Sequence, residues 1–149
     1  MVTTVGMASD VVEMLNDLIQ LDHDAIQAYE AAIGRIDNSE HQRQLTAFKD
    51  DHVRHTRELG RVVSELGGEP ATGASMKQVL TVGKVAFADM IGDRAVLQAM
   101  KTNEDDTNTA YERAAAWSDL PQSAVPLIKV ALGDERKHRN WLEKTIAAS

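Results

Sequence analysis

The sequence repeats itself, and this repeat restricts the folds that the chain can adopt. Residues of the first half have counterparts 82 or 83 positions later, most of them of the same or related type. The pairs at the shorter spacing are Leu15 and Leu97, Asp22 and Glu104, Asp24 and Asp106, and Tyr29 and Tyr111. The pairs at the longer spacing are Asp51 and Asp134, His52 and Glu135, Arg54 and Lys137, and His55 and His138. We therefore expect the two halves to fold as copies of one unit.

The hydrophobic pattern of each copy is helical. Apolar residues recur at alternating steps of three and four, which places them on one face of a helix. We expect helices over about residues 10–36, 39–66, 94–117 and 122–147, with a crossover over about 67–93 that includes a short helix from Met76 to Met90. Short links within each half and a long crossover between them predict two antiparallel hairpins, and hence an all-α four-helix bundle.

Local signals mark the expected starts of three helices. Asp10 and Glu13 resemble a capping pair at the start of the first helix, and Ser39 and Gln42 have the spacing of a capping box at the start of the second. Pro126 belongs in the first turns of the last helix, because proline deeper in a helix would kink it. These signals support the boundaries that the hydrophobic pattern gives.

Composition excludes several classes of protein. A chain of 149 residues with 43% hydrophobic and 26% charged residues predicts one domain over residues 1–149. The absence of cysteine excludes disulfides, thiolate zinc sites and iron–sulfur clusters. A net charge of -7 argues against nucleic acid. Because no segment resembles a secretory signal or a membrane span, we expect a cytoplasmic protein that contacts no membrane.

The apolar stripes also carry polar residues that would be buried. If the hairpins fold about midpoints near residues 38 and 120, their polar residues fall at one level of the core. The candidate ligands are Asp22, His52, His55, Glu104, Glu135 and His138. Unpaired buried charges are costly, so these groups must pair with one another, hold a metal ion or be neutral.

These motifs resemble the ferritin-like superfamily, of the bacterioferritin and rubrerythrin type. Its di-iron members place one carboxylate on each of two helices and a Glu-x-x-His pair on each of the other two. Glu135-Arg136-Lys137-His138 matches that pair, and Leu21 to Tyr29 is similar to the bacterioferritin segment that carries a ligand glutamate. The LNDLI segment from Leu15 to Ile19 also resembles a bacterial ferritin-like group of unassigned function.

Two residues depart from the ferritin-like pattern. His52 stands where the family has the glutamate that bridges both irons, and Asp22 stands where a longer glutamate is usual. An imidazole does not bridge two metals in the way a carboxylate does. The sequence leaves open a single ion, or a dinuclear site bridged only by Glu135.

Two classes of function remain. The resemblance implies a metal-dependent oxidoreductase that binds one or two ions of iron, or alternatively manganese or zinc, and oxidises iron(II) or reduces oxygen or peroxide. Tyr29 and Tyr111 are then candidate catalytic residues that supply a proton or an electron. The alternative is a non-catalytic bundle with a structural polar core and a stress-related or interaction role. In either class we expect a homo-oligomer, with a dimer favoured.

Overall fold

A computed structural model of the protein describes residues 10–73 and 90–149. Its described helices are α1 (Val11–Ile33), α2 (Ser39–Glu65), α4 (Asp93–Ala115) and α5 (Val125–Ala148). The predicted all-α four-helix bundle is confirmed. The short helix predicted from Met76 to Met90 falls outside the described residues except for Met90, which is not helical.

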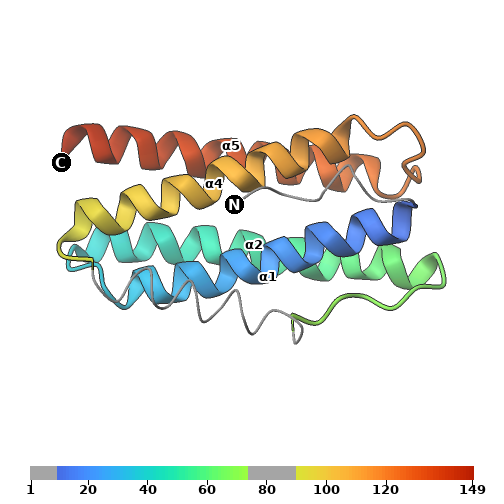
Figure 1. The fold of residues 1–149 in the computed structure, drawn as a ribbon, viewed down its shortest axis with the longest axis horizontal. Coiled ribbons are helices and arrows are strands. Elements are labelled where there is room, and N and C mark those ends of the chain that lie inside the picture. The colour runs from blue at the N-terminus through green and yellow to red at the C-terminus, as the bar shows by residue number, and fades with distance from the viewer. Residues whose placement is uncertain (1–9, 74–89) are drawn as a thin grey trace.

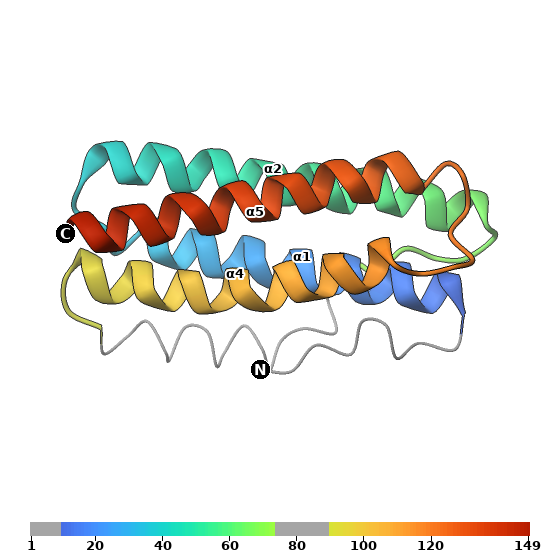
Figure 2. The same ribbon diagram turned by 90° about the horizontal axis from the view of Figure 1, so that it is seen from above.

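The four helices run along the long axis of the molecule as two antiparallel hairpins (Figures 1 and 2). α1 packs on α2 and α4 packs on α5, while α1 also contacts α4 and α2 also contacts α5. α2 ends at one end of the bundle and α4 begins at the other (Figure 1). The connection between the hairpins therefore has to cover the length of the bundle, as expected for a crossover.

The helix ends differ from the predicted ones by up to three residues. The carboxylate of Asp10 accepts a hydrogen bond from the Glu13 amide and caps α1, as predicted. The cap of α2 was predicted wrongly: Asn38, one residue before Ser39, accepts hydrogen bonds from two amides of the first turn. α5 begins at Val125, so that Pro126 lies in its first turn, where a missing amide proton costs nothing.

A carboxylate fastens the two hairpins at the end of the bundle where α1 meets α2. Asp93, the first residue of α4, accepts hydrogen bonds from the amides of Asp37 and Asn38, at 2.9 and 3.1 Å. These amides belong to the turn between α1 and α2. The start of the second hairpin is thereby fixed against the turn of the first.

The core consists of two apolar clusters, built mainly from aliphatic side chains. One cluster comprises Met14, Leu15, Leu18, Ile19, Leu21, Leu59, Val62, Val63, Ala110, Tyr111, Ala114, Ala124, Ile128, Ala131 and Leu132. The other comprises Tyr29, Ala32, Ile36, Leu45, Phe48, Val96, Leu97, Met100 and Leu142. Along α1 and α2, the polar candidates Asp22, His52 and His55 fall between the residues of these clusters.

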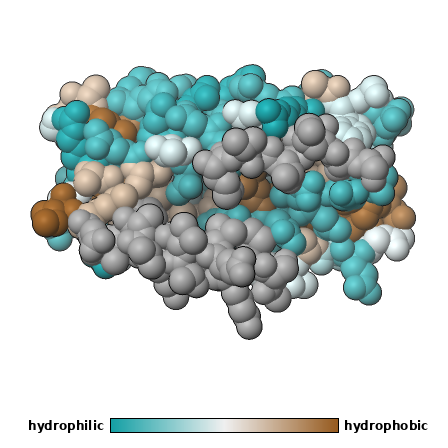
Figure 3. Space-filling view, viewed as in Figure 1, coloured by the Kyte–Doolittle hydropathy of each residue, from teal (hydrophilic) through white to brown (hydrophobic). Residues whose placement is uncertain are grey.

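The described surface is polar over much of the face drawn in Figure 3, with small separate apolar patches. None of the described helices combines the length and the hydrophobicity that crossing a membrane requires.

Candidate metal site

The six candidate ligands form one polar layer inside the bundle. All six are buried, and the most exposed of them, His55, has only 3% of its surface accessible. Each helix contributes: Asp22 comes from α1, His52 and His55 from α2, Glu104 from α4, and Glu135 and His138 from α5. The spacing of three residues within α2 and within α5 turns both members of each pair to the same side.

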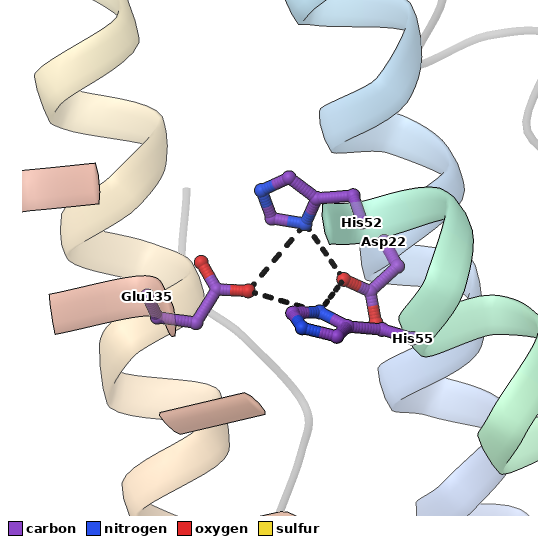
Figure 4. A group of neighbouring side chains, drawn as sticks. All are labelled: Asp22, His52, His55 and Glu135. Carbon is purple, nitrogen blue, oxygen red and sulfur yellow. Dashed lines mark hydrogen bonds and ion pairs between the residues drawn. The ribbon is translucent and has the colours of Figure 1, made fainter. Parts of the chain in front are cut away.

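Four of these residues form a first group, which is drawn in Figure 4 and contains Asp22, His52, His55 and Glu135. His52 Nδ1 lies 2.7 Å from Asp22 Oδ1 and 3.4 Å from Glu135 Oε1. His55 Nδ1 lies 3.2 Å from the same aspartate oxygen and 3.5 Å from the same glutamate oxygen. Two imidazole nitrogens and two carboxylate oxygens thus face a common point.

A second group contains His52, Glu104, Glu135 and His138. His52 turns its other nitrogen, Nε2, to Glu104 Oε1 at 3.3 Å. His138 Nδ1 lies 3.3 Å from Glu104 Oε1 and 3.6 Å from Glu135 Oε2. In both groups the donor atoms lie within 4.8 Å of one another, and His52 and Glu135 belong to both.

The two buried tyrosines bind the carboxylates of the opposite hairpin. The Tyr29 hydroxyl donates to Glu104, and the Tyr111 hydroxyl donates to Asp22. Burial and the neighbouring carboxylates raise the pKa of both phenols well above the usual value. Both tyrosines therefore keep their protons and hold the carboxylates in place.

A second crossed pattern lies outside the two groups. Asp51 on α2 accepts from His138 Nε2 at 2.8 Å, and Asp134 on α5 accepts from His55 Nε2 at 2.9 Å. The guanidinium of Arg54 donates to both aspartates. Carboxylates at this position fix the tautomer and the orientation of a metal-binding histidine.

Asp51 and Asp134 are not among the six candidate ligands, although the repeat contains both. Their copying at a spacing of 83 residues was the signal that would have identified them. Thr107 and Asn108 were also missed. Thr107 Oγ1 lies 3.0 Å from both Glu104 Oε2 and Glu135 Oε2, and Asn108 Nδ2 donates to the backbone carbonyls of the same two glutamates.

The pKa shifts in the layer follow from the pairing of its histidines with carboxylates. Burial alone would lower the pKa of His138, but hydrogen bonds to Asp51 and Glu104 outweigh burial and raise it to about 9. Burial would likewise lower the pKa of His55, but Asp22 and Asp134 raise it to about 12. Burial opposes ionisation of Asp22, yet the two histidines of α2 lower its pKa to about 2. Without a metal ion, the layer is held by imidazolium–carboxylate pairs.

Glu135 differs from the other carboxylates of the layer. Burial raises its pKa, and nearby Glu104 raises it further. Among the described residues no group forms a hydrogen bond with Oε1 of Glu135, although the residue is completely buried. This oxygen has only long ion pairs to His52 and His55 among the described residues, at 3.4 and 3.5 Å, and a cation at the centre of the first group would bind it more closely.

Two histidines lie away from both groups. His23 lies against the backbone at Gly73, and His41 packs edge-on to Trp141. Three of the five histidines in the sequence therefore face the polar layer.

Comparison with protein families matches residues 10–116 of the chain to a family described as Domain of unknown function (DUF2383). A search of curated proteins and a search of solved structures each give no match.

Proposed function

We propose that this chain, which belongs to the DUF2383 family, binds a divalent transition metal in the polar layer of its bundle. The observation that carries the proposal is the pair of buried groups, each with four donor atoms within 4.8 Å of one another. Imidazole and carboxylate ligands together suit iron, manganese and zinc. This proposal leaves the number of ions at one or two.

The residues present fit such an ion. The first group combines two neutral-capable imidazoles with two carboxylates, whose charge would balance that of a divalent cation. Glu135 Oε1, which forms no hydrogen bond with the described residues and lies 3.4 and 3.5 Å from two histidine nitrogens, would gain a closer partner. His55 and His138 each have an aspartate at the ring nitrogen that faces away from the layer, as metal-binding histidines commonly do.

We further propose that the protein is ferritin-like in function, and oxidises iron(II) or reduces dioxygen or peroxide. When bound, iron or manganese would supply one-electron redox chemistry. The chain excludes bulk water from the layer, because all six candidate ligands are buried, and this favours reactants as small as dioxygen or peroxide. Tyr29 and Tyr111 hold protons next to Glu104 and Asp22, and are the candidate proton or electron donors.

The alternative is a structural polar core in a non-catalytic bundle. The observation in its favour is that three histidines can pair with the three carboxylates of the layer, at 2.7 to 3.6 Å. Such a network specifies how the helices dock without any ion. The two functions differ in one measurable property, the affinity for metal.

The test loads metal-free protein with iron(II) under anaerobic conditions, counts iron per chain, and then follows oxidation after dioxygen or peroxide is added. We expect the wild type to retain iron, and the His55→Ala/His138→Ala double variant to retain none. If the protein binds iron but oxidises it no faster than free iron(II) is oxidised, the proposed metal binding stands and the proposed redox function is rejected.

The matched control is the His23→Ala/His41→Ala double variant, which also loses two imidazoles but none from the layer. It should bind iron as the wild type does. Circular dichroism checks that each variant keeps its helices, and His55→Gln/His138→Gln replaces the alanine variant if that one unfolds. A wild type that binds iron no more tightly than the double variant would favour the structural polar core.

A further inference from the structure

His52 and Glu135 belong to both groups, but they differ in whether they can offer a lone pair to both groups at once. Glu135 turns Oε1 to the first group and Oε2 to the second. A carboxylate has lone pairs on both oxygens, so it can serve both groups at once. His52 turns Nδ1 to the first group and Nε2 to the second. A neutral imidazole has a lone pair on only one of its nitrogens.

We propose that the chain binds one metal ion, in the first group of Asp22, His52, His55 and Glu135, and that His52 limits the site to that ion. This inference rests on the proposed metal binding and specifies its stoichiometry and its ligands. With the proton of His52 on Nε2, Nδ1 offers its lone pair to the first group. The second group then lacks one of its four ligands.

Distances within the first group suit one ion. Donor atoms about 2 Å from a four-coordinate ion lie about 3.3 Å from one another. The two nitrogens of the group lie 2.7 and 3.2 Å from Asp22 Oδ1, and 3.4 and 3.5 Å from Glu135 Oε1. Figure 4 shows these four side chains converging from α1, α2 and α5.

Each ligand of the first group turns one nitrogen or oxygen to the proposed ion, and a contact to its other nitrogen or oxygen holds it in place. His55 Nε2 donates to Asp134 Oδ2, and His52 Nε2 faces Glu104 Oε1. Asp22 accepts from Tyr111 through Oδ2, which leaves Oδ1 for the ion. The Thr107 hydroxyl lies 3.0 Å from Glu135 Oε2, which leaves Oε1 for the ion. Four ligands that are oriented in this way form a prepared site.

The second group has its oxygens occupied instead. Tyr29 donates to Glu104 Oε1, the oxygen that faces His52 and His138. Thr107 lies at hydrogen-bond distance from Oε2 of both Glu104 and Glu135. Glu135, which belongs to both groups, turns Oε1 to the first group, and this oxygen accepts no hydrogen bond from the described residues. Hydroxyl donors thus compete with an ion in the second group and leave the first group free.

The experiment measures Co²⁺ bound per chain by equilibrium dialysis of the metal-free protein, with the visible absorption of the bound ion as a second readout. We expect one Co²⁺ per wild-type chain. His55→Ala, which removes a ligand of the first group only, should lower the affinity at least tenfold. Its matched counterpart His138→Ala, which removes a ligand of the second group only, should keep one ion and a similar spectrum.

The His52→Glu variant tests the limiting role of His52. A carboxylate at this position can serve both groups, so we expect two Co²⁺ per chain, and one would overturn that role. Two ions in the wild type would overturn the inference and leave the proposed function standing, whereas none would overturn the proposed function itself. Loss of the ion in His138→Ala, with helices intact, would overturn the assignment to the first group. If His55→Ala unfolds, His55→Gln is used, and the wild-type stoichiometry is decisive without any variant.

Discussion

Hairpin α1–α2 contributes Asp22, His52 and His55 to the polar layer, whereas hairpin α4–α5 contributes Glu104, Glu135 and His138. Much of the two contributions is equivalent. Each hairpin supplies a tyrosine to the carboxylate of the other and an aspartate to the histidine of the other. The clearest difference is His52 against Glu135, since a neutral imidazole offers a lone pair on one nitrogen only and a carboxylate offers lone pairs on both oxygens. A repeated fold can therefore carry an unsymmetrical site through one substitution.

The largest expected effect comes from making the hairpins alike. His52→Glu brings a fourth carboxylate into the layer and removes an imidazole that pairs with Asp22 and Glu104. Breaking a buried ion pair costs about 3–5 kcal/mol, so the metal-free variant should lose stability on that scale. Urea unfolding in the presence of a chelator measures the loss, and added divalent metal should recover it.

The control for this change is Val53→Glu, which places the same charge on the exposed neighbouring residue. It should change stability by no more than about 0.5 kcal/mol, as surface substitutions usually do. An equal loss of stability in both variants would contradict the stabilising role of the buried ion pairs.

Raising the pH should destabilise the metal-free protein, and the contributions of the two hairpins should be lost over different pH ranges. The pKa of His138 is raised to about 9 and that of His55 to about 12, against an ordinary value of 6.5. A raised histidine pKa gives stability that is complete below pH 6.5 and is lost as the pH rises through the folded value. For His138 the loss amounts to about 3 kcal/mol between pH 6.5 and 9. For His55 it continues towards pH 12.

Urea unfolding of the metal-free protein from pH 6 to 10 measures this loss, and His138→Gln should make the fall in stability between pH 6.5 and 9 less steep, leaving the part that His55 contributes. Metal affinity should change in the opposite direction, because ligand histidines must be deprotonated, so it rises with pH. Metal-free stability that does not fall between pH 6.5 and 9 would contradict the imidazolium–carboxylate pairing.

Removing the two tyrosine hydroxyls tests the crossed bonds one at a time. Tyr29→Phe and Tyr111→Phe each remove one of the hydrogen bonds that a buried carboxylate accepts. A bond to a charged group contributes about 1.5–3 kcal/mol, so the two variants should lose similar stability. Only Tyr111→Phe should also weaken metal binding, because Tyr111 holds a ligand of the first group. Equal metal affinity in the two variants would argue against that group.

The smallest effects belong to the cations outside the layer. Arg54 pairs with Asp51 and Asp134, and its counterpart Lys137 lies 3.3 and 3.7 Å from the same two carboxylates. Arg54 is partly exposed and Lys137 is exposed, so each alanine variant should lose at most about 1 kcal/mol of stability, with more lost for Arg54. Thermal unfolding at low and high salt compares the two, and a larger loss for Lys137→Ala would contradict this order.

The arrangement of helices followed from the sequence, because apolar residues at steps of three and four define helix faces. The repeat and the estimated hairpin midpoints predicted that Asp22 lies level with His55, and these side chains are in contact. That the six candidates bind metal stays a proposal. Sequence reasoning did reach the convergence of these side chains, since it depends on helix geometry alone.

The finer features could not be predicted from helix geometry. Asp51 lies one position off the buried stripe, and only the packing of α2 on α5 brings its carboxylate to His138. The nitrogen that His52 turns to each group depends on the rotation of one side chain. Asn38 caps α2 in place of Ser39 because the first helical turn begins one residue earlier than the capping-box spacing suggests.

The crossed bonds between the hairpins also determine how the molecule opens. Neither hairpin can leave the other without exposing apolar surface and separating Tyr29 from Glu104, Tyr111 from Asp22, and both histidine–aspartate pairs. Partial unfolding of one hairpin would cost nearly as much as unfolding the whole chain. Amide protons in the middle of α1 and of α5 should therefore exchange with solvent at the same free energy, as members of a single cooperative unit.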